Sequence, residues 1–411
     1  MKLFGRLIAV CLIGHVTSTV AVAQTQDDFF NDAVLQEVRL AISSRDWQTL
    51  KARASEDTYY SADITWNGVT VRNVGIRSRG SSTRNGIKPG LRVDINRFVA
   101  SQEFLGLKAF VLDNMYSDAS LVRESVTMKM FAKMGVPASR EAHARLFVNN
   151  EYVGVYVLSE SIDRTFVNRA FGAAEANVEN GGYLLEFEHV AFYHFEYLGP
   201  DLSAYAGLFK PQTRDTDSAA NIYGPLADMI RTINESADED FETAVGRYLD
   251  LKQAVAYVAI EEFMVEWDGL VGFAGMNNFY LYRSRQTGLS QLIPKDKDAA
   301  LASVNDSILL RLDTNVLVRR ALMVPELRQA FVDALLRCAA LADEPGVDDP
   351  RGWLEREVDG ETRQIAQAVS EDPVYPASFD QFQATVDQLL DFARNRSAVV
   401  RAQIADLAGP P

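Results

Sequence analysis

The hydrophobic residues of this chain repeat with two different periods, and the change from one to the other constrains the fold more than any other feature. Between about residues 61 and 158 apolar and polar residues alternate, which is typical of strands with one buried face. From about residue 220 the spacing is mostly that of helices, interrupted by one short pair of strands at 279–293. Strands followed by helices predict an α+β fold. We expect a strand-rich N-terminal lobe over residues 24–160 and a mainly helical C-terminal lobe over 161–411.

Turn signals place the expected strands. Asn67-Gly68 lies between two alternating runs and predicts a hairpin. Further runs at 74–77 and 91–95 extend it into a small antiparallel sheet over 61–98. A second hairpin is expected to turn at Asn149-Asn150, and another strand follows at 183–187.

Capping signals place the expected helices. An amphipathic stretch from about residue 27 to 54 comes before the strands. A helix is expected after Asp118, as its N-cap, with Gly135 at its end. In the C-terminal half, helices are expected at 224–234 and 239–249, and from the N-cap Asp250 to about residue 267.

The composition excludes several classes of protein. Hydrophobic residues make up 47% of the chain, which provides a sizeable core and is unlike a disordered segment. The net charge of −15 opposes general attraction to nucleic acid or to anionic membranes. We therefore expect no nucleic-acid partner.

The first residues predict export. Lys2 and Arg6 precede an apolar stretch to about Val16, and Ala21-Val22-Ala23 has the pattern that signal peptidases cut. We expect residues 1–23 to be a signal peptide and the protein to be exported, with no membrane span after cleavage. Cys338 is then the one remaining thiol, expected to be buried in a helix, so no disulfide is expected within the chain.

The residues that most clearly indicate a chemical function lie between 266 and 298. An apolar helix ends near Asp268, Asn278 opens a hairpin, and Asp296 follows its second strand. Because the two ends of an antiparallel hairpin lie side by side, Asn278 and Asp296 are expected to be neighbours. An amide oxygen with carboxylates suits Mg²⁺ that also binds phosphate.

The same order of residues occurs in protein kinases. There an Asp accepts the proton of the substrate hydroxyl, a following Asn holds a metal ion, and an Asp beyond a short hairpin holds the metal on the nucleotide. Asp268, Asn278 and Asp296 follow that order. The His-Arg-Asp and Asp-Phe-Gly signatures are absent, which excludes an ordinary kinase.

Six motifs in order resemble the CotH kinase family over roughly residues 35–300. They are VGIRSRGSS (74–82), LGLK (105–108) with SLVR (120–123), GVYVLSE (154–160), GGYLLE (181–186), NNFYLY (277–282), and Asp-x-Asp at 296 and 298. The resemblance implies a divergent bilobal protein-kinase-like fold that binds ATP with Mg²⁺. It also implies transfer of the γ-phosphoryl group to Ser or Thr of an exported or surface protein.

The resemblance also implies roles for single residues. Asp268 would be the base or hydroxyl-orienting group, Asn278 and Asp296 metal ligands, and Asp298 a second acidic ligand or support. Residues implied at the nucleotide are Arg79, Ser81, Ser82 and Lys88 over the phosphates, Arg92 with Glu124 as an anchoring pair, and Glu160 in the connector facing the adenine.

One departure from the family pattern leaves an alternative. The family usually has Trp-Asp-x-Asp where this chain has Lys295-Asp296-Lys297-Asp298. A lysine there either helps to neutralise phosphate charge or pairs with the ligand carboxylates and blocks the metal ion. The alternative is therefore a non-catalytic pseudokinase or a structural surface protein. Transfer to a glycan or small molecule, or transfer of a nucleotidyl group, also remains open.

Overall fold

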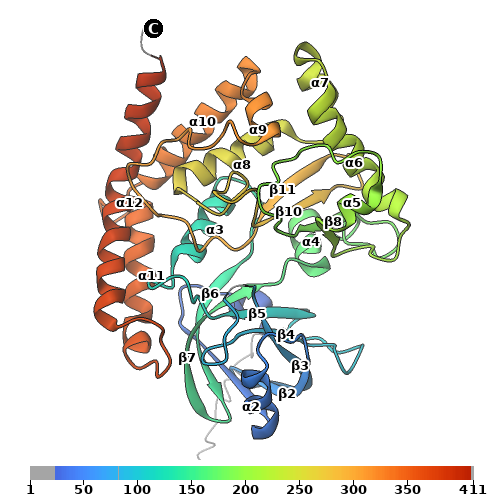
Figure 1. The fold of residues 1–411 in the computed structure, drawn as a ribbon. Coiled ribbons are helices and arrows are strands. Elements are labelled where there is room, and N and C mark those ends of the chain that lie inside the picture. Colours follow the sequence, from blue (N-terminus) through green and yellow to red (C-terminus); the bar gives the residue numbers. More distant parts are fainter. Residues whose placement is uncertain (1–23, 82, 409–411) are drawn as a thin grey trace, which may run out of the picture.

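The N-terminal part of the computed structural model is a closed β-barrel, and the structure describes residues 24–81 and 83–408 (Figure 1). The strand order around the barrel is β1-β2-β3-β4-β5-β7-β6. Its strands are β1 (Gln36–Ile42), β2 (Tyr60–Trp66), β3 (Val69–Arg79), β4 (Gly90–Asp94), β5 (Ala109–Asp113), β6 (Glu141–Val148) and β7 (Glu151–Glu160). Strand β1 closes the barrel because it pairs antiparallel with β2 and parallel with β6. The predicted leader lies outside the described residues.

Both predicted hairpin turns in the barrel are confirmed. Asn67 and Gly68 have φ values of 45° and 81°, and Asn149 and Asn150 have 51° and 66°. Two successive left-handed residues match the twist of the flanking strands, which is why Asn and Gly occur there. The predicted sheet over 61–98 is thus one part of a larger barrel.

The expectation of one amphipathic stretch over 27–54 is wrong. The chain there forms helix α1 (Gln26–Phe29), strand β1 and helix α2 (Ser44–Ala52). Along β1 buried residues alternate with more exposed ones, so that Val38 and Leu40 face the barrel interior. Phe29 fills the same interior, with its ring 5.2 Å from that of Trp66.

Helix α3 (Arg123–Lys133) lies in the chain between the barrel strands β5 and β6 and packs against the C-terminal part. Asp118 is not its N-cap, because the helix begins five residues later, but the Asp118 carboxylate accepts the first helical N–H, that of Arg123. The apolar face of α3, including Met130 and Phe131, belongs to the core of the C-terminal part.

A four-stranded sheet and a set of helices form the C-terminal part. The sheet order is β11-β10-β8-β9, with β8 (Tyr183–Phe187), β9 (Phe209–Pro211), β10 (Phe279–Arg283) and β11 (Ser290–Pro294). The helices are α4 (Arg164–Phe171), α5 (Leu202–Ala206), α6 (Ala219–Glu235), α7 (Phe241–Val245) after the 3₁₀ turn Asp238–Asp240, α8 (Leu251–Met264), α9 (Val316–Ala321), α10 (Pro325–Ala342), α11 (Trp353–Ser370) and α12 (Phe379–Ala408). Asp250 caps α8 as predicted. The helix ends at Met264, before the predicted residue 267, because Val265 is left-handed with φ of 54°.

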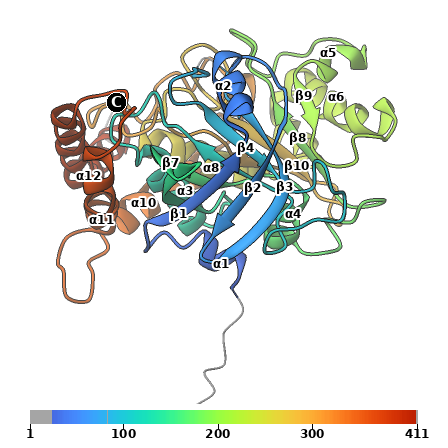
Figure 2. The ribbon, with the colours of Figure 1, turned by 90° about the horizontal axis from the view of Figure 1, so that it is seen from below.

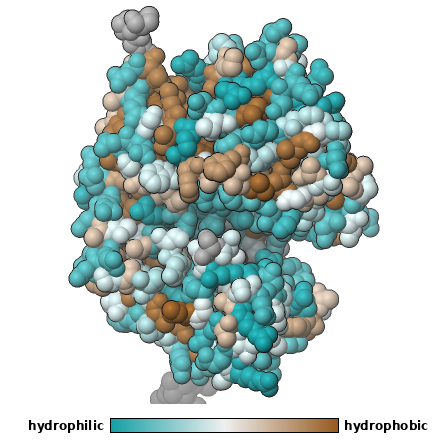
Figure 3. Space-filling model, in the orientation of Figure 1, coloured by the Kyte–Doolittle hydropathy of each residue, from teal (hydrophilic) through white to brown (hydrophobic). Residues whose placement is uncertain are grey.

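The C-terminal helices contact both parts of the molecule. Helices α11 and α12 run along one side of the barrel and of the remaining helices (Figure 1), and Figure 2 shows α5 and α6 on the opposite side. The Tyr152 hydroxyl on β7 donates to the carbonyl of Ala368 on α11 at 2.8 Å. Figure 3 shows a notch between the barrel and the C-terminal part on the side away from these helices. None of the helices in the described part of the chain combines the length and apolarity that a membrane crossing needs.

Candidate active site

The base of the β10–β11 hairpin brings Asn278 and Asp296 to one end of the C-terminal sheet. Phe279 pairs with Pro294, and the Lys295 N–H donates to the carbonyl of Asn278 at 3.1 Å. Asn278 and Asp296 both have left-handed backbones, with φ of 56° and 50°. Such conformations cost energy and are typical of functional sites.

Asp268 is hydrogen-bonded directly to this hairpin. It lies in the loop after α8, and its Oδ2 accepts hydrogen bonds from the side-chain amides of Asn277 at 3.0 Å and Asn278 at 3.1 Å. Both bonds use Oδ2, which orients the carboxylate and leaves Oδ1 for another donor. The charges of Asp268 and Asp296 also act on each other. The structure therefore brings Asp268, Asn278 and Asp296 together.

The two lysines on either side of Asp296 are paired with other carboxylates and do not block it. Lys297 is fully buried, and its Nζ donates to Glu261 Oε1 at 2.6 Å and to the carbonyl of Asn278 at 2.9 Å. The Nζ of Lys295 lies 2.6 Å from Glu186 Oε1. Each ammonium group is thus paired with a carboxylate other than Asp296 or Asp298. Lys297 also holds the backbone of Asn278 in place.

Several acidic side chains surround Asp296. Burial, followed by the charge of Asp113, raises the pKa of Asp296. Burial and then Asp296 raise the pKa of Asp298 to about 9. Burial and then Glu141 hold the pKa of Glu124 well above its ordinary value. Buried carboxylates that disfavour one another's ionisation form a site in which an added cation is favourable.

The basic residue that faces this cluster is Arg79. It forms an ion pair with Asp113, and its charge also acts on Asp296 and Glu124. The predicted pair of Arg92 with Glu124 is not formed. In the β3–β4 register Arg92 lies opposite Arg77. The charge of Arg92 acts on Asp163 and Tyr280 and not on Glu124.

Two residues predicted at the nucleotide are bound elsewhere. Lys88 is buried with its Nζ 2.8 Å from Asp372 Oδ2, in the segment after α11. The buried Glu160 carboxylate accepts hydrogen bonds from Arg140 and Arg169. Neither charged group is available to a phosphate or a base. Ser81 is exposed in the turn after Arg79, and Ser82 lies outside the described residues.

The donor set fits Mg²⁺ bound together with phosphate. Asn278, Asp296 and Asp298 could supply hard oxygen ligands. Two basic residues, Arg79 and Lys295, act on Asp296 through their charges. Arg79 is already paired with Asp113, and Lys295 with Glu186. Within the described ranges no three His, Cys, Asp or Glu side chains form a metal site alone. A cation here would need the Asn278 amide and phosphate or water oxygens, as is usual for Mg²⁺.

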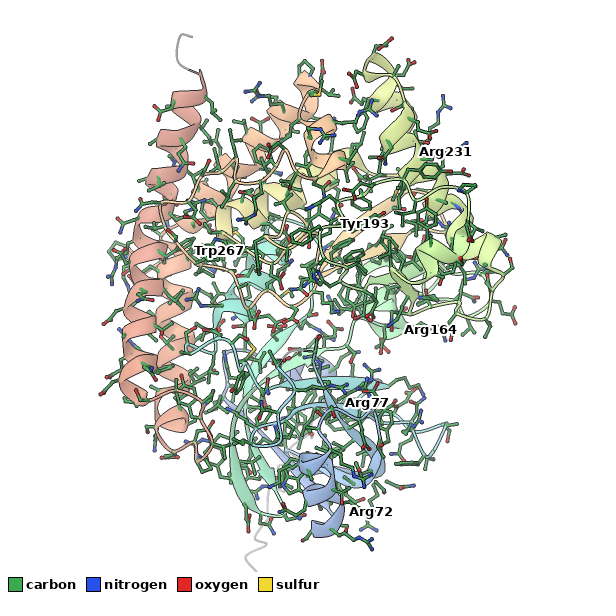
Figure 4. All side chains as sticks on the ribbon, viewed as in Figure 1. Arg72, Arg77, Arg164, Tyr193, Arg231 and Trp267 are labelled. Carbon is green, nitrogen blue, oxygen red and sulfur yellow. The ribbon has the colours of Figure 1, made fainter. Side chains whose placement is uncertain are left out.

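A phosphate-bearing ligand at this site would also find unpaired positive charge nearby. Arg92 is half-buried on β4 and makes no ion pair with any residue that the structure describes. Figure 4 labels Arg77 on β3 and Arg164 at the start of α4 on opposite sides of the notch. Arg77 is itself paired with Asp57 at 2.9 Å, so the unpaired charge that we consider on the barrel side is that of Arg92.

Sequence reasoning missed several residues of the site. Asp113 ends a strand that was not predicted, so the pairing partner of Arg79 was unknown. Asn277, next to the predicted Asn278, is the second amide on Asp268. Glu261 lies near the end of the apolar helix α8, followed by Glu262, and charged residues in such a run are the one signal that marks it.

The sequence matches a known family over most of its length. The sequence model described as "CotH kinase protein" matches residues 76–400. The chain is 24% identical over 389 residues to "Inner spore coat protein H" of Bacillus subtilis, covering 92% of this chain and 99% of that protein. It is also 24% identical over 161 residues to "Spore coat protein homolog 1" of Rhizopus delemar, covering 39% and 25%. The predicted resemblance is confirmed, and the match extends a hundred residues beyond the predicted limit of 300.

Two solved structures have partial similarity to the chain. A Shewanella oneidensis complex of the toxin–antitoxin proteins HipA and HipB with operator DNA matches with 13% identity and a TM-score of 0.35, covering 79% of this chain and 67% of that one. The Helicobacter pylori "proinflammatory kinase CtkA" matches with 10% identity and a TM-score of 0.29, covering 78% and 95%. The family assignment rests on the sequence matches.

Proposed function

Because this chain belongs to the CotH kinase protein family, we propose that it is a Mg²⁺-dependent kinase that transfers the γ-phosphoryl group of ATP to a Ser or Thr hydroxyl of a protein. The observation that carries the proposal is the hydrogen bonding of Asp268 to Asn278 at the base of the hairpin that also presents Asp296. This matches the order of a kinase base, a metal-binding Asn and a metal-binding Asp.

Each residue has a task in this reaction. Asn278, Asp296 and Asp298 would hold Mg²⁺, which when bound neutralises phosphate charge. Asp268, fixed through Oδ2, presents Oδ1 to the acceptor hydroxyl, accepts its proton and orients its oxygen towards the γ-phosphorus. Arg79 and Arg92 add positive charge on the barrel side of the notch.

The names of the relatives support a destination outside the cytoplasm. Both are called spore coat proteins, and a coat is a surface layer. Together with the predicted signal peptide this supports an exported kinase that acts on a surface or coat protein.

The test uses the purified chain with labelled ATP and Mg²⁺. Asp268→Asn and Asp296→Asn should each reduce phosphate transfer by about 10²-fold or more, while thermal stability stays unchanged. Glu239→Gln, an exposed acidic residue in the 3₁₀ turn before α7, is the matched control and should keep full activity.

Other outcomes identify the alternatives. A thermal shift with ATP and Mg²⁺ but no transfer would mean a pseudokinase, and no shift at all would mean a binding platform. The mass added to the product separates phosphoryl from nucleotidyl transfer, since only the second retains the base.

A further inference from the structure

Large apolar side chains are exposed directly beside Asp268. Trp267 is 43% exposed, Phe273 66% and Phe192 73%, and Val190, two residues before Phe192, is 46% exposed. Figure 4 shows Trp267 on the C-terminal part, and Figure 3 shows apolar side chains on that face. Grouped exposed apolar side chains of this size usually mark a binding surface.

Hydrogen bonds connect this aromatic patch, formed by Trp267, Phe273 and Phe192, to the candidate active site. The Phe273 N–H donates to the carbonyl of Trp267 at 3.0 Å, and the Phe192 N–H donates to the carbonyl of Ala274 at 2.7 Å. Trp267 immediately precedes Asp268. The patch and the carboxylate of Asp268 are therefore parts of one loop structure.

Further hydrogen bonds fix the Trp267 indole and the backbone of this loop structure. The Trp267 indole N–H donates to Asp306 at 2.9 Å, and Arg311 donates to the carbonyl of Val271 at 3.0 Å. Phe192 has a left-handed backbone with φ of 62°, an unusual conformation for a bulky residue. A chain that holds an exposed Phe in this conformation spends stability on it, which is typical of a functional position.

We propose that the aromatic patch is the docking surface for the acceptor protein, and that it favours an extended segment with an apolar side chain beside the phosphorylated Ser or Thr. This rests on the proposed function, since Asp268 is the group that the acceptor hydroxyl must reach. An acceptor larger than a few atoms has to cross the surface next to Asp268, and the exposed Trp267 of the aromatic patch is the residue directly before it. Phe192, Phe273 and Val190 carry no hydrogen-bonding group, so they match apolar protein side chains better than the hydroxyls of a glycan.

The experiment is a positional scan of Ser- and Thr-centred peptides with ATP and Mg²⁺. The chain should phosphorylate peptides with Phe, Leu or Ile near the acceptor best, and those with Asp or Ser there poorly. Phe192→Asn and Phe273→Gln should raise the KM for the best peptide about tenfold and flatten the preference. Asn tolerates the left-handed backbone, so the first variant keeps the loop. Val347→Gln, which changes a fully exposed apolar residue in the loop before α11, is the matched control and should change nothing.

Two further measurements separate this inference from the proposed function. ATP and Mg²⁺ binding, measured by thermal shift, should be equal in the chain and both variants. If the chain transfers no phosphate, fluorescence anisotropy of the same peptides still tests the docking surface. The peptides with an apolar flanking residue should bind about tenfold tighter than the others, and this difference should disappear in the variants. Equal binding of all peptides, preferential binding of oligosaccharides, or self-association lost in the variants would each overturn the inference.

Discussion

Replacing Lys297 by Met tests how the hairpin base is held. The side chain is fully buried, with its ammonium group 2.6 Å from Glu261 and 2.9 Å from the carbonyl of Asn278. Without it, the buried Glu261 carboxylate keeps the backbone N–H of Leu270 at 2.8 Å but loses its positive partner. Removing one member of a buried ion pair costs about 3–5 kcal/mol. We therefore expect Lys297→Met to lower the free energy of unfolding by that amount and the Tm by roughly 4–6 °C.

The double variant Lys297→Met/Glu261→Gln isolates the charge pair. It removes both charges and keeps the shape, so it should be less destabilised than the sum of the single variants by about 2 kcal/mol. Urea unfolding gives the free energies, and binding of ATP with Mg²⁺ to the folded proteins reports on Asn278. Single variants that lose less than about 1 kcal/mol, or an additive double variant, would refute the reasoning.

Three further changes probe other buried contacts. Asp372→Asn leaves the buried Lys88 without its carboxylate and should cost about 3–5 kcal/mol in chemical denaturation; an unchanged midpoint would show that the barrel does not depend on the segment after α11. Arg396→Met removes the donors to four backbone carbonyls and should cost at least about 3 kcal/mol, with faster amide exchange of the loop at 304–306; exchange confined to α12 would contradict this. Gly275→Ala places a Cβ 2.7 Å from the N of Phe192 at a φ of 108°, so it should cost about 1–3 kcal/mol and weaken acceptor phosphorylation while ATP binding stays constant; a loss of ATP binding would place the loop in the nucleotide site instead.

Local signals predicted the parts of the fold that depend on local chemistry. The turns at Asn67-Gly68 and Asn149-Asn150 were predicted because the backbone conformation itself selects these residues. Barrel closure could not be predicted, because β1 pairs with β6 across more than a hundred residues. Strand β1 was hidden because short flanking helices merged with it into one amphipathic stretch.

The same distinction separates the predicted site contacts that the structure forms from those that it does not form. The proximity of Asn278 and Asp296 follows from hairpin geometry, so the sequence was sufficient for it. The assignments of Lys88 and Glu160 to the nucleotide failed because their partners, Asp372 for one and Arg140 for the other, come from distant or unpredicted contacts. The sequence of a strand motif does not show which residue its charged side chain pairs with in the folded protein.

The C-terminal helices are part of the structure that builds the site. The buried guanidinium group of Arg396 on α12 donates to the carbonyls of Glu262 and Phe263 at 2.6 and 2.9 Å. It also donates to those of Val304 and Asp306, both at 2.8 Å. The first two residues end the helix that leads to Asp268, and the other two follow Asp298. One side chain thus ties together the two segments that carry the proposed base and the proposed metal ligands, which is a physical reason for the family match to continue to residue 400.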